Sequence, residues 1–273
     1  FQAEDGIRDH LLGLVGSEMC IRDSYLGGNN MKRLTLSGMA LLAILVLLGG
    51  CDSLRTVRGT GDMAGEEREV ADFSAVNLAG IGSVIVDYGD KEALRIEAEE
   101  NLLPYLEIEV EDGTLTLGIR EGVNVIPTQG IFYYLTVSDL DEVTVSGLGN
   151  IDVPRLEGSQ VAINVTGGGD INVEELRADN LDVLISGLGD LNIDGGETAV
   201  QRIRISGGGN YNGQERAGDE VAVTISGLGS AAVWAREQLD AEISGGGSVR
   251  YTGRPQVTKE ISGLGEVEAA GGR

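Results

Sequence analysis

A five-residue motif recurs at nearly constant spacing through the C-terminal half of this 273-residue chain. Its first residue is Ser or Thr, its second and fourth are Gly, its third is Leu or Gly, and its fifth is polar. The copies begin at Ser146, Thr166, Ser186, Ser206, Ser226, Ser244 and Ser262. The spacing is 20 residues between the first five copies and 18 between the last three. A related stretch, 79–83, lies upstream. Periods in this range are typical of solenoids, propellers and arrays.

The residues between the motifs alternate between apolar and polar, as in 180–185 and 190–194. Such alternation is typical of half-buried strands. Twenty residues at about 3.3 Å each give a path of roughly 66 Å, which suits one coil of three short strands with bends. It is too short for a propeller blade of about 40 residues, and the glycine density disfavours helices. The chain is therefore predicted to be all-β, a right-handed parallel β-helix (solenoid) with about 20-residue coils.

The residues before the repeat also show a strand pattern. From Glu69 onward apolar residues alternate, and 106–110 and 115–117 flank a turn signal at 111–113. We expect these residues to form an irregular β N-terminal cap, so that 69–273 is a single β-helical domain.

The two outer glycines of each motif are expected at a bend where φ is positive or where backbones crowd. These structural repeat glycines are Gly147, Gly149, Gly167, Gly169, Gly187, Gly189, Gly207, Gly209, Gly227, Gly229, Gly245, Gly247, Gly263 and Gly265. The residue between them alternates between large and small: Leu148, Gly168, Leu188, Gly208, Leu228, Gly246 and Leu264. We interpret this alternation as filling one strip of core or flank.

The position after each motif forms a polar column whose first members are Asn150, Asp170, Asp190 and Asn210. One interpretation is a polar ladder whose side chains cap the amides of the bends. The other is a cation site, because stacked Asp170 and Asp190 carboxylates would lie within a few ångströms and could bind Ca²⁺. No other cofactor is expected.

Residues 31–51 resemble a bacterial lipoprotein signal. Met31 is followed by two basic residues, and the apolar run 38–48 is too short to span about 30 Å of hydrocarbon. The run ends in Leu-Gly-Gly-Cys51, which is similar to the lipobox at which the cysteine thiol receives a diacylglycerol. An ordinary signal peptide with a chance cysteine is the alternative. We expect lipidation of Cys51 and attachment to a membrane.

This assignment divides the N-terminal part of the chain into three segments. Residues 1–30 resemble translated sequencing-adapter sequence, the alternative being a genuine disordered leader, and 31–50 are the signal peptide. Residues 51–68 mix Gly, Thr and charges and are expected to form a flexible tether. The predicted location is the bacterial cell envelope, outside the cytoplasm. Asp52 resembles an inner-membrane retention signal, but that rule is not general, so the choice of membrane stays open.

Composition excludes several classes of function. The net charge of −24 repels nucleic-acid phosphates. His10 is the only histidine, and Cys20 and Cys51 are the only cysteines, so zinc sites and histidine-dependent nucleophiles lack their residues. These bounds favour a protein that is not an enzyme.

The stretches 68–76, 101–104 and 112–117, followed by the repeated Ser-Gly-Leu-Gly-Asn-Ile and Thr-Gly-Gly-Gly-Asp-Ile blocks, resemble the family called putative auto-transporter adhesin, head GIN domain. The resemblance covers about residues 68–268. It implies a β-helical domain outside the cytoplasm, on secreted or lipid-anchored envelope proteins. It assigns no catalytic or binding residue.

Three functions stay open at this stage. The favoured one is a non-catalytic, lipid-anchored envelope protein that presents a β-helical surface to a glycan or an envelope partner. The second is a structural or regulatory envelope component. The third is a polysaccharide lyase or hydrolase, for which the nominal residues are Asp170, Asp190, Asp194, Lys91, Lys259, Arg202 and Arg204. The sequence does not indicate an oligomeric state.

Overall fold

The computed structural model describes residues 55–271, and strands make up almost all of its regular structure. The N-terminal part contains β1 (Arg55–Arg58), β2 (Met63–Arg68), β3 (Ala75–Leu78), β4 (Ser83–Tyr88), β5 (Ala93–Glu99), the short 3₁₀ helix η1 (Leu103–Tyr105), β6 (Leu106–Glu111), β7 (Thr114–Ile119), β8 (Val123–Ile126) and β9 (Phe132–Val137). The repeat region contains β10 (Glu142–Val145), β11 (Asn150–Val165), β12 (Ile171–Ile185), β13 (Leu191–Ile193), β14 (Gly196–Ile205), β15 (Tyr211–Ile225), β16 (Ser230–Ile243), β17 (Ser248–Thr252), β18 (Gln256–Ile261) and β19 (Glu266–Gly271).

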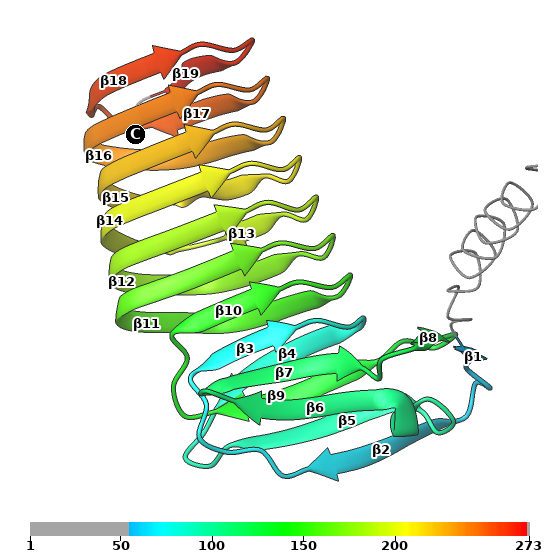
Figure 1. The fold of residues 1–273 in the computed structure, drawn as a ribbon. Helices are drawn as coiled ribbons and strands as arrows, with labels where there is room; N and C mark the ends of the chain where they lie inside the picture. The colour runs from blue at the N-terminus through cyan, green and yellow to red at the C-terminus, as the bar shows by residue number, and fades with distance from the viewer. Residues whose placement is uncertain (1–54, 272–273) are drawn as a thin grey trace, which may run out of the picture. The chain divides into compact units, whose positions relative to one another are not determined.

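The repeat region is a stack of parallel coils (Figure 1). β11 pairs with β12 in parallel, from Ile151 opposite Ile171 to Val165 opposite Ile185, a constant offset of one repeat. The pairing falls into three runs, 151–153, 155–158 and 160–165, separated by bends. The predicted parallel β-solenoid is confirmed, with about 6 turns at a spacing of about 20 residues.

Each coil therefore has two different edges. The first and third runs are joined by the repeated motif, and these turns all project from one side of the stack, which we call the turn edge (Figure 1). The second run and its two bends form the opposite side, which we call the far edge.

The core is a set of aliphatic columns that run along the stack. In β12 the inward residues are Ile171, Val173, Leu181, Val183 and Ile185, none more than 1% exposed. Their register partners in neighbouring coils are also buried and mostly Val, Ile or Leu. Burial of each such side chain contributes roughly 1.5–3 kcal/mol. The core is thus continuous from coil to coil.

The middle residue of each motif lies outside this core. Leu148, Leu188, Leu228 and Leu264 are all exposed at the turn edge. The sequence left open whether these residues fill the core or its flank, and the structure places them on the flank.

The outer glycines of each motif are required by close approach of backbones. A Cβ on Gly187 would lie 1.8 Å from the carbonyl oxygen of Gly167, and one on Gly189 would lie 1.8 Å from that of Gly169. The other copies of these two columns show the same conflict at 1.7–2.2 Å. None of these glycines has a positive φ. Crowding between stacked turns, and not backbone handedness, explains the glycine repeat.

Two substitutions at neighbouring glycines test this explanation. Gly187→Ala should lower the free energy of unfolding by about 3 kcal/mol or more, because backbone cannot move away from the new methyl group. Gly208→Ala should cost less than about 1 kcal/mol, because its Cβ would meet only the movable Leu188 side-chain end, at 3.2 Å. Denaturant unfolding of the two variants measures the difference. Equal losses would contradict the crowding argument.

The N-terminal cap begins as a coil of the solenoid and ends as an antiparallel sheet. β3 and β4 pair in parallel with β10 and β11, so 79–82 forms the first turn of the turn edge. β5 pairs in antiparallel fashion with β2 and β9. These antiparallel strands cover the first coil, as the predicted irregular cap requires.

The segment 55–68, assigned from composition to a flexible tether, is structured instead. β1 pairs with β8 in parallel and β2 pairs with β5. The reason is long-range: the carboxylate of Glu99 is fully enclosed and accepts hydrogen bonds from the amides of Gly61 (2.6 Å) and Thr128 (2.7 Å) and from the Thr128 hydroxyl (2.7 Å). Asn101 donates to the carbonyl of Arg58 at 2.8 Å. The rest of the expected tether, 51–54, lies outside the described residues.

These hydrogen bonds make the attachment of residues 55–61 dependent on pH. The Thr128 amide, with the Thr128 hydroxyl and the Gly61 amide, holds the pKa of Glu99 below its ordinary 4.5, against a burial effect that raises it. The ionised carboxylate therefore stabilises the contact fully above about pH 4.5, and this stabilisation is lost as the pH falls through the lowered pKa.

We expect hydrogen-exchange protection of the Gly61 and Thr128 amides to fall on acidification below about pH 4.5. In Glu99→Gln protection should already be low at neutral pH and change little with acid. Glu97→Gln, at a partly exposed residue of the same strand, serves as the control and should behave as the parent. An unchanged acid response in Glu99→Gln would show that another group controls the contact.

Candidate functional site

A groove follows the far edge of the solenoid across five successive coils. Its floor follows a column of small residues in register: Gly158, Ala178 and Thr198 line the groove, and the buried Gly218 and Ala235 continue the column. At about 4.8 Å per coil this column is roughly 19 Å long. The cavity has a volume of about 430 Å³. Because the bends carry small residues in consecutive coils, the surface is hollow here.

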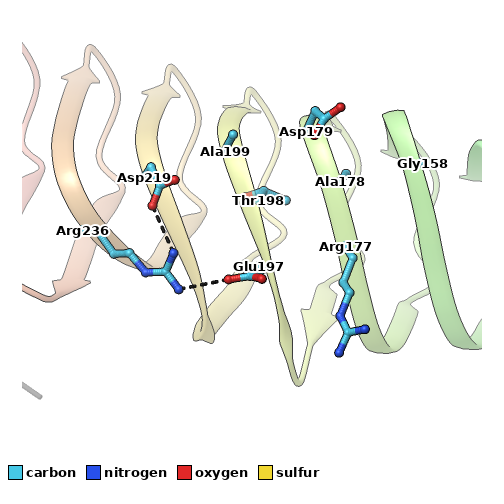
Figure 2. A pocket seen from close by; sticks show the side chains of 9 residues that line it. All are labelled: Gly158, Arg177, Ala178, Asp179, Glu197, Thr198, Ala199, Asp219 and Arg236. Carbon is cyan, nitrogen blue, oxygen red and sulfur yellow. Dashed lines mark hydrogen bonds and ion pairs between the residues drawn. The ribbon is translucent and has the colours of Figure 1, made fainter.

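Charged side chains form the two rims of this groove (Figure 2). Asp179 and Asp219 stand on one rim, and Arg177 and Glu197 on the other. Arg236 lies between them and donates to Asp219 at 3.1 Å and to Glu197 at 3.2 Å. The hydrogen bonds to Asp219 and Glu197 raise the pKa of Arg236 above its ordinary value. All three side chains are substantially exposed, so the ion pairs orient the rim more than they stabilise the fold.

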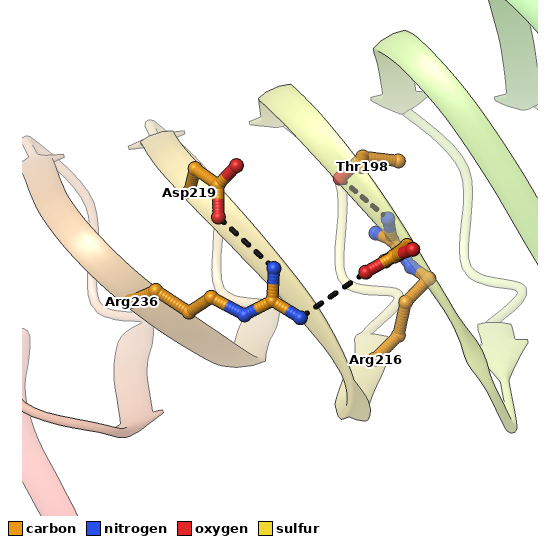
Figure 3. Close-up of polar contacts among 5 residues, drawn as sticks. Thr198, Arg216, Asp219 and Arg236 are labelled. Atoms are coloured by element: carbon orange, nitrogen blue, oxygen red, sulfur yellow. Dashed lines mark hydrogen bonds and ion pairs between the residues drawn. The ribbon is translucent and has the colours of Figure 1, made fainter.

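A buried arginine lies directly beneath the groove floor (Figure 3). Arg216 is fully buried and donates to the Thr198 hydroxyl at 2.9 Å and to Gln201 Oε1 at 2.8 Å, and also to the Tyr211 hydroxyl. Thr198 itself lines the groove. The groove therefore has a cation below its floor, held by three neutral acceptors.

The arginine fits because one column of the core changes at this point. Its register equivalents in earlier coils are Leu156, Leu176 and Gly196. At Gly196 φ is +108°, and a Cβ there would lie 1.9 Å from the carbonyl oxygen of Leu176, so glycine is required at this position. Gln201 replaces the core residue that is Leu181 in the previous coil. A polar cluster thus replaces aliphatic packing between the adjacent coils of β14 and β15.

Both arginines come from irregularities in the pairing of β15 with β16. Gly213 lies opposite Val233 but Ala217 lies opposite Trp234, so residues 214–216 fall outside the register between β15 and β16, and one coil bend is shortened. A second shift between Gly218 and Glu220 places Arg236 at the groove. These two shifts change the repeat from 20 to 18 residues. The change in repeat length lies at the C-terminal end of the groove.

The four residues of the predicted polar column do form one ladder. The Asp170 amide donates to Asn150 Oδ1 at 3.1 Å, the Asp190 amide to Asp170 Oδ1 at 2.8 Å, and the Asn210 amide to Asp190 Oδ1 at 2.7 Å. The arrangement matches the capping interpretation, since each side chain bonds the amide of the next coil. Within residues 55–271 no three His, Cys, Asp or Glu side chains gather as a metal site. Calcium binding at the ladder stays a prediction.

A second ladder was not predicted. Asn172 donates to Asp152 at 2.8 Å, Asn192 to Asn172 at 2.9 Å, and Asn212 to Asn192 at 2.8 Å. The members of this second ladder are spaced by 20 residues, and each lies two positions after a member of the first polar column. Alignment of the repeats beyond the motif would have identified this column.

The other nominal residues are dispersed. Asp194 is separated from Asp190 by β13, and Arg202 pairs with Asp182 at 4.0 Å on the third run. Lys91 lines a different cavity, in the cap. Cys51 and the signal segment lie outside the described residues. The sequence did not identify the groove, because its floor is defined by small residues that carry no chemistry of their own.

No helix within residues 55–271 is long and apolar enough to cross a membrane.

The chain matches the family model described as "Putative auto-transporter adhesin, head GIN domain" over residues 72–255. Three solved structures are similar over nearly their whole length. A putative adhesin from Bacteroides fragilis has a TM-score of 0.73 at 21% identity, covering 78% of this chain and 99% of the other. A putative adhesin from Parabacteroides merdae has 0.65 at 26%, covering 79% and 99%. A protein from Parabacteroides distasonis, titled a putative lipid binding protein, has 0.63 at 22%, covering 79% and 100%. No curated protein matches the chain.

Proposed function

The chain belongs to the putative auto-transporter adhesin, head GIN domain family, and from this premise we propose that it is a non-catalytic, lipid-anchored protein of the bacterial cell envelope whose far-edge groove binds a glycan. The adhesin name of the family supports a role in binding. The observation that carries the glycan assignment is the groove itself, which runs along the stack and is lined by charged hydrogen-bonding groups.

The shape of the groove favours a linear polymer. It extends along the repeat axis over a small-residue floor, so an extended chain lies in it without crossing the coils. Carboxylates accept and guanidinium groups donate hydrogen bonds, the pair of functions that sugar hydroxyls require. Arg236 is held by Asp219 and Glu197, which orients all three groups before a ligand arrives.

The same contacts favour binding over catalysis. Hydrolysis of a glycosidic bond requires one carboxyl group that acts as an acid and a second as a base or nucleophile. Glu197 and Asp219 are instead both engaged by the guanidinium of Arg236, so neither carboxylate is free to serve as the acid or the base. The lyase or hydrolase alternative would require one of these two carboxyl groups to be free of Arg236.

Blocking the groove should remove glycan binding. Ala199 is exposed and lines the groove, so Ala199→Trp fills it without entering the core. We expect affinity for a glycan selected on an array to fall at least tenfold, equivalent to about 1.4 kcal/mol. Thr224→Trp, on the exposed face of the third run, is the matched control and should bind as the parent. Equal affinity of all three proteins for every glycan would contradict the assignment.

Lipid attachment is a separate prediction. In cells that express the full chain, the protein should sediment with membranes and incorporate a labelled fatty acid. Cys51→Ser should abolish the label and release the protein, because the thiol is the acylation site, whereas Cys20→Ser should change neither. A labelled Cys51→Ser protein would contradict the assignment.

A further inference from the structure

The turn edge carries a regular row of exposed leucines. Leu148, Leu188, Leu228 and Leu264 are 73%, 78%, 80% and 96% exposed. They occupy alternate coils, so successive leucines in the regular part of the stack are about 9.6 Å apart. Isolated surface leucines need no explanation, but an aligned row of the most exposed large apolar side chains does.

The row is a continuous, uncharged ridge. In the coil that follows each of the first three leucines, the equivalent residue is glycine, and the leucine side chain lies over that glycine. For example, Leu188 Cδ2 is 3.2 Å from where a Cβ on Gly208 would be. The Ser/Thr-Gly-Leu/Gly-Gly part of each motif contains no charged residue. In a chain with a net charge of −24, an uncharged ridge requires an apolar neighbour.

The geometry of the anchor places this ridge beside a bilayer. Three residues lie between Cys51 and Arg55, so the first residue of β1 is at most about 14 Å, four extended Cα-to-Cα steps, from the lipidated cysteine. β1 pairs with β8, which follows β7. β7 ends at Ile119, against Gly80 of the first turn of the turn edge. β1 and β8 consequently lie on the side of the domain from which the turns project (Figure 1).

Basic side chains lie on and beside β1, the first described strand after Cys51. Arg55 and Arg120 both stack on the ring of Tyr105, at 5.4 and 5.7 Å, and Arg58 is exposed on the same short strand β1. In an otherwise acidic chain, this cluster is suited to the phosphate groups of lipid headgroups.

We infer that the turn edge is a membrane-contact surface whose leucine ridge inserts into the bilayer to which Cys51 is attached, so that the solenoid lies along the membrane. The inference rests on the proposed lipid attachment. The ridge adds buried apolar area to the attachment that the lipid provides, and the strength of interfacial binding increases with that area. In this orientation the far edge, with its groove, faces away from the bilayer.

The test attaches the protein to lipid chemically, so its outcome does not depend on acylation in cells. Residues 51–273 contain one cysteine, Cys51, and include the compact unit 53–273 with its continuous core. This protein is coupled through Cys51 to maleimide lipid in phosphatidylcholine vesicles with brominated acyl chains. In a Trp234→Phe background, Leu188→Trp reports on the turn edge and Ala199→Trp on the far edge.

We expect bromine to quench the fluorescence of the Leu188→Trp protein at least threefold more than that of the Ala199→Trp protein. Changing Leu148, Leu228 and Leu264 to Asn should remove most of that difference, without a change in circular dichroism, because all three side chains are exposed. Changing Val110 and Leu184, two exposed apolar residues elsewhere, to Asn is the control and should leave it intact.

Two results would overturn the inference. Equal quenching of the two reporters would show that the turn edge does not face the bilayer. Leucine-dependent dimerisation of the uncoupled protein, with no quenching on vesicles, would assign the ridge to a second copy of the chain. Failure of acylation at Cys51 in cells would leave the vesicle result standing and would count against the proposed attachment alone.

Discussion

The backbone contact between stacked turns is the constraint on which the rest of the structure depends. The turns at Gly167 and Gly187 are so close that a methyl group added to Gly187 would clash with the carbonyl oxygen of Gly167. This approach allows the turn amides to bond the preceding coil, as the Leu188 amide does to the Gly167 carbonyl at 2.9 Å. Register is thereby fixed once per coil, and the buried columns and polar ladders follow from it.

The same constraint determines what each edge can present. Of the three central positions of the motif, only the middle one has room for a side chain, and at this position the leucines are exposed. At the far edge the bends tolerate changes in length, as the shifts between β15 and β16 show. One edge is thus repetitive and apolar, and the other is variable and polar.

The sequence predicted the parts of the fold that repeat. Period, strand alternation and glycine spacing were sufficient for the solenoid, because each coil contacts its equivalent neighbours and the same local pattern decides each contact. The tether prediction failed at 55–68 because its strands depend on Glu99 and Thr128, residues far away in the sequence. The groove was not predicted for a related reason. Its floor is a column of small residues, and that column can be recognised only when the bends of successive coils are aligned.

Arg216 shows why the site is found where the repeat fails. A perfect repeat offers every coil the same surface, so a ligand would have no preferred position along the stack. Residues 214–216, which fall outside the register between β15 and β16, place the buried Arg216 in this coil. The compensating shift in the same strand pair brings Arg236 against Asp219 and Glu197. Two irregularities that together shorten the repeat therefore concentrate charge at a single place on the far edge. In a solenoid, departures from the period are the local features that distinguish one coil from the next, and here they coincide with the groove.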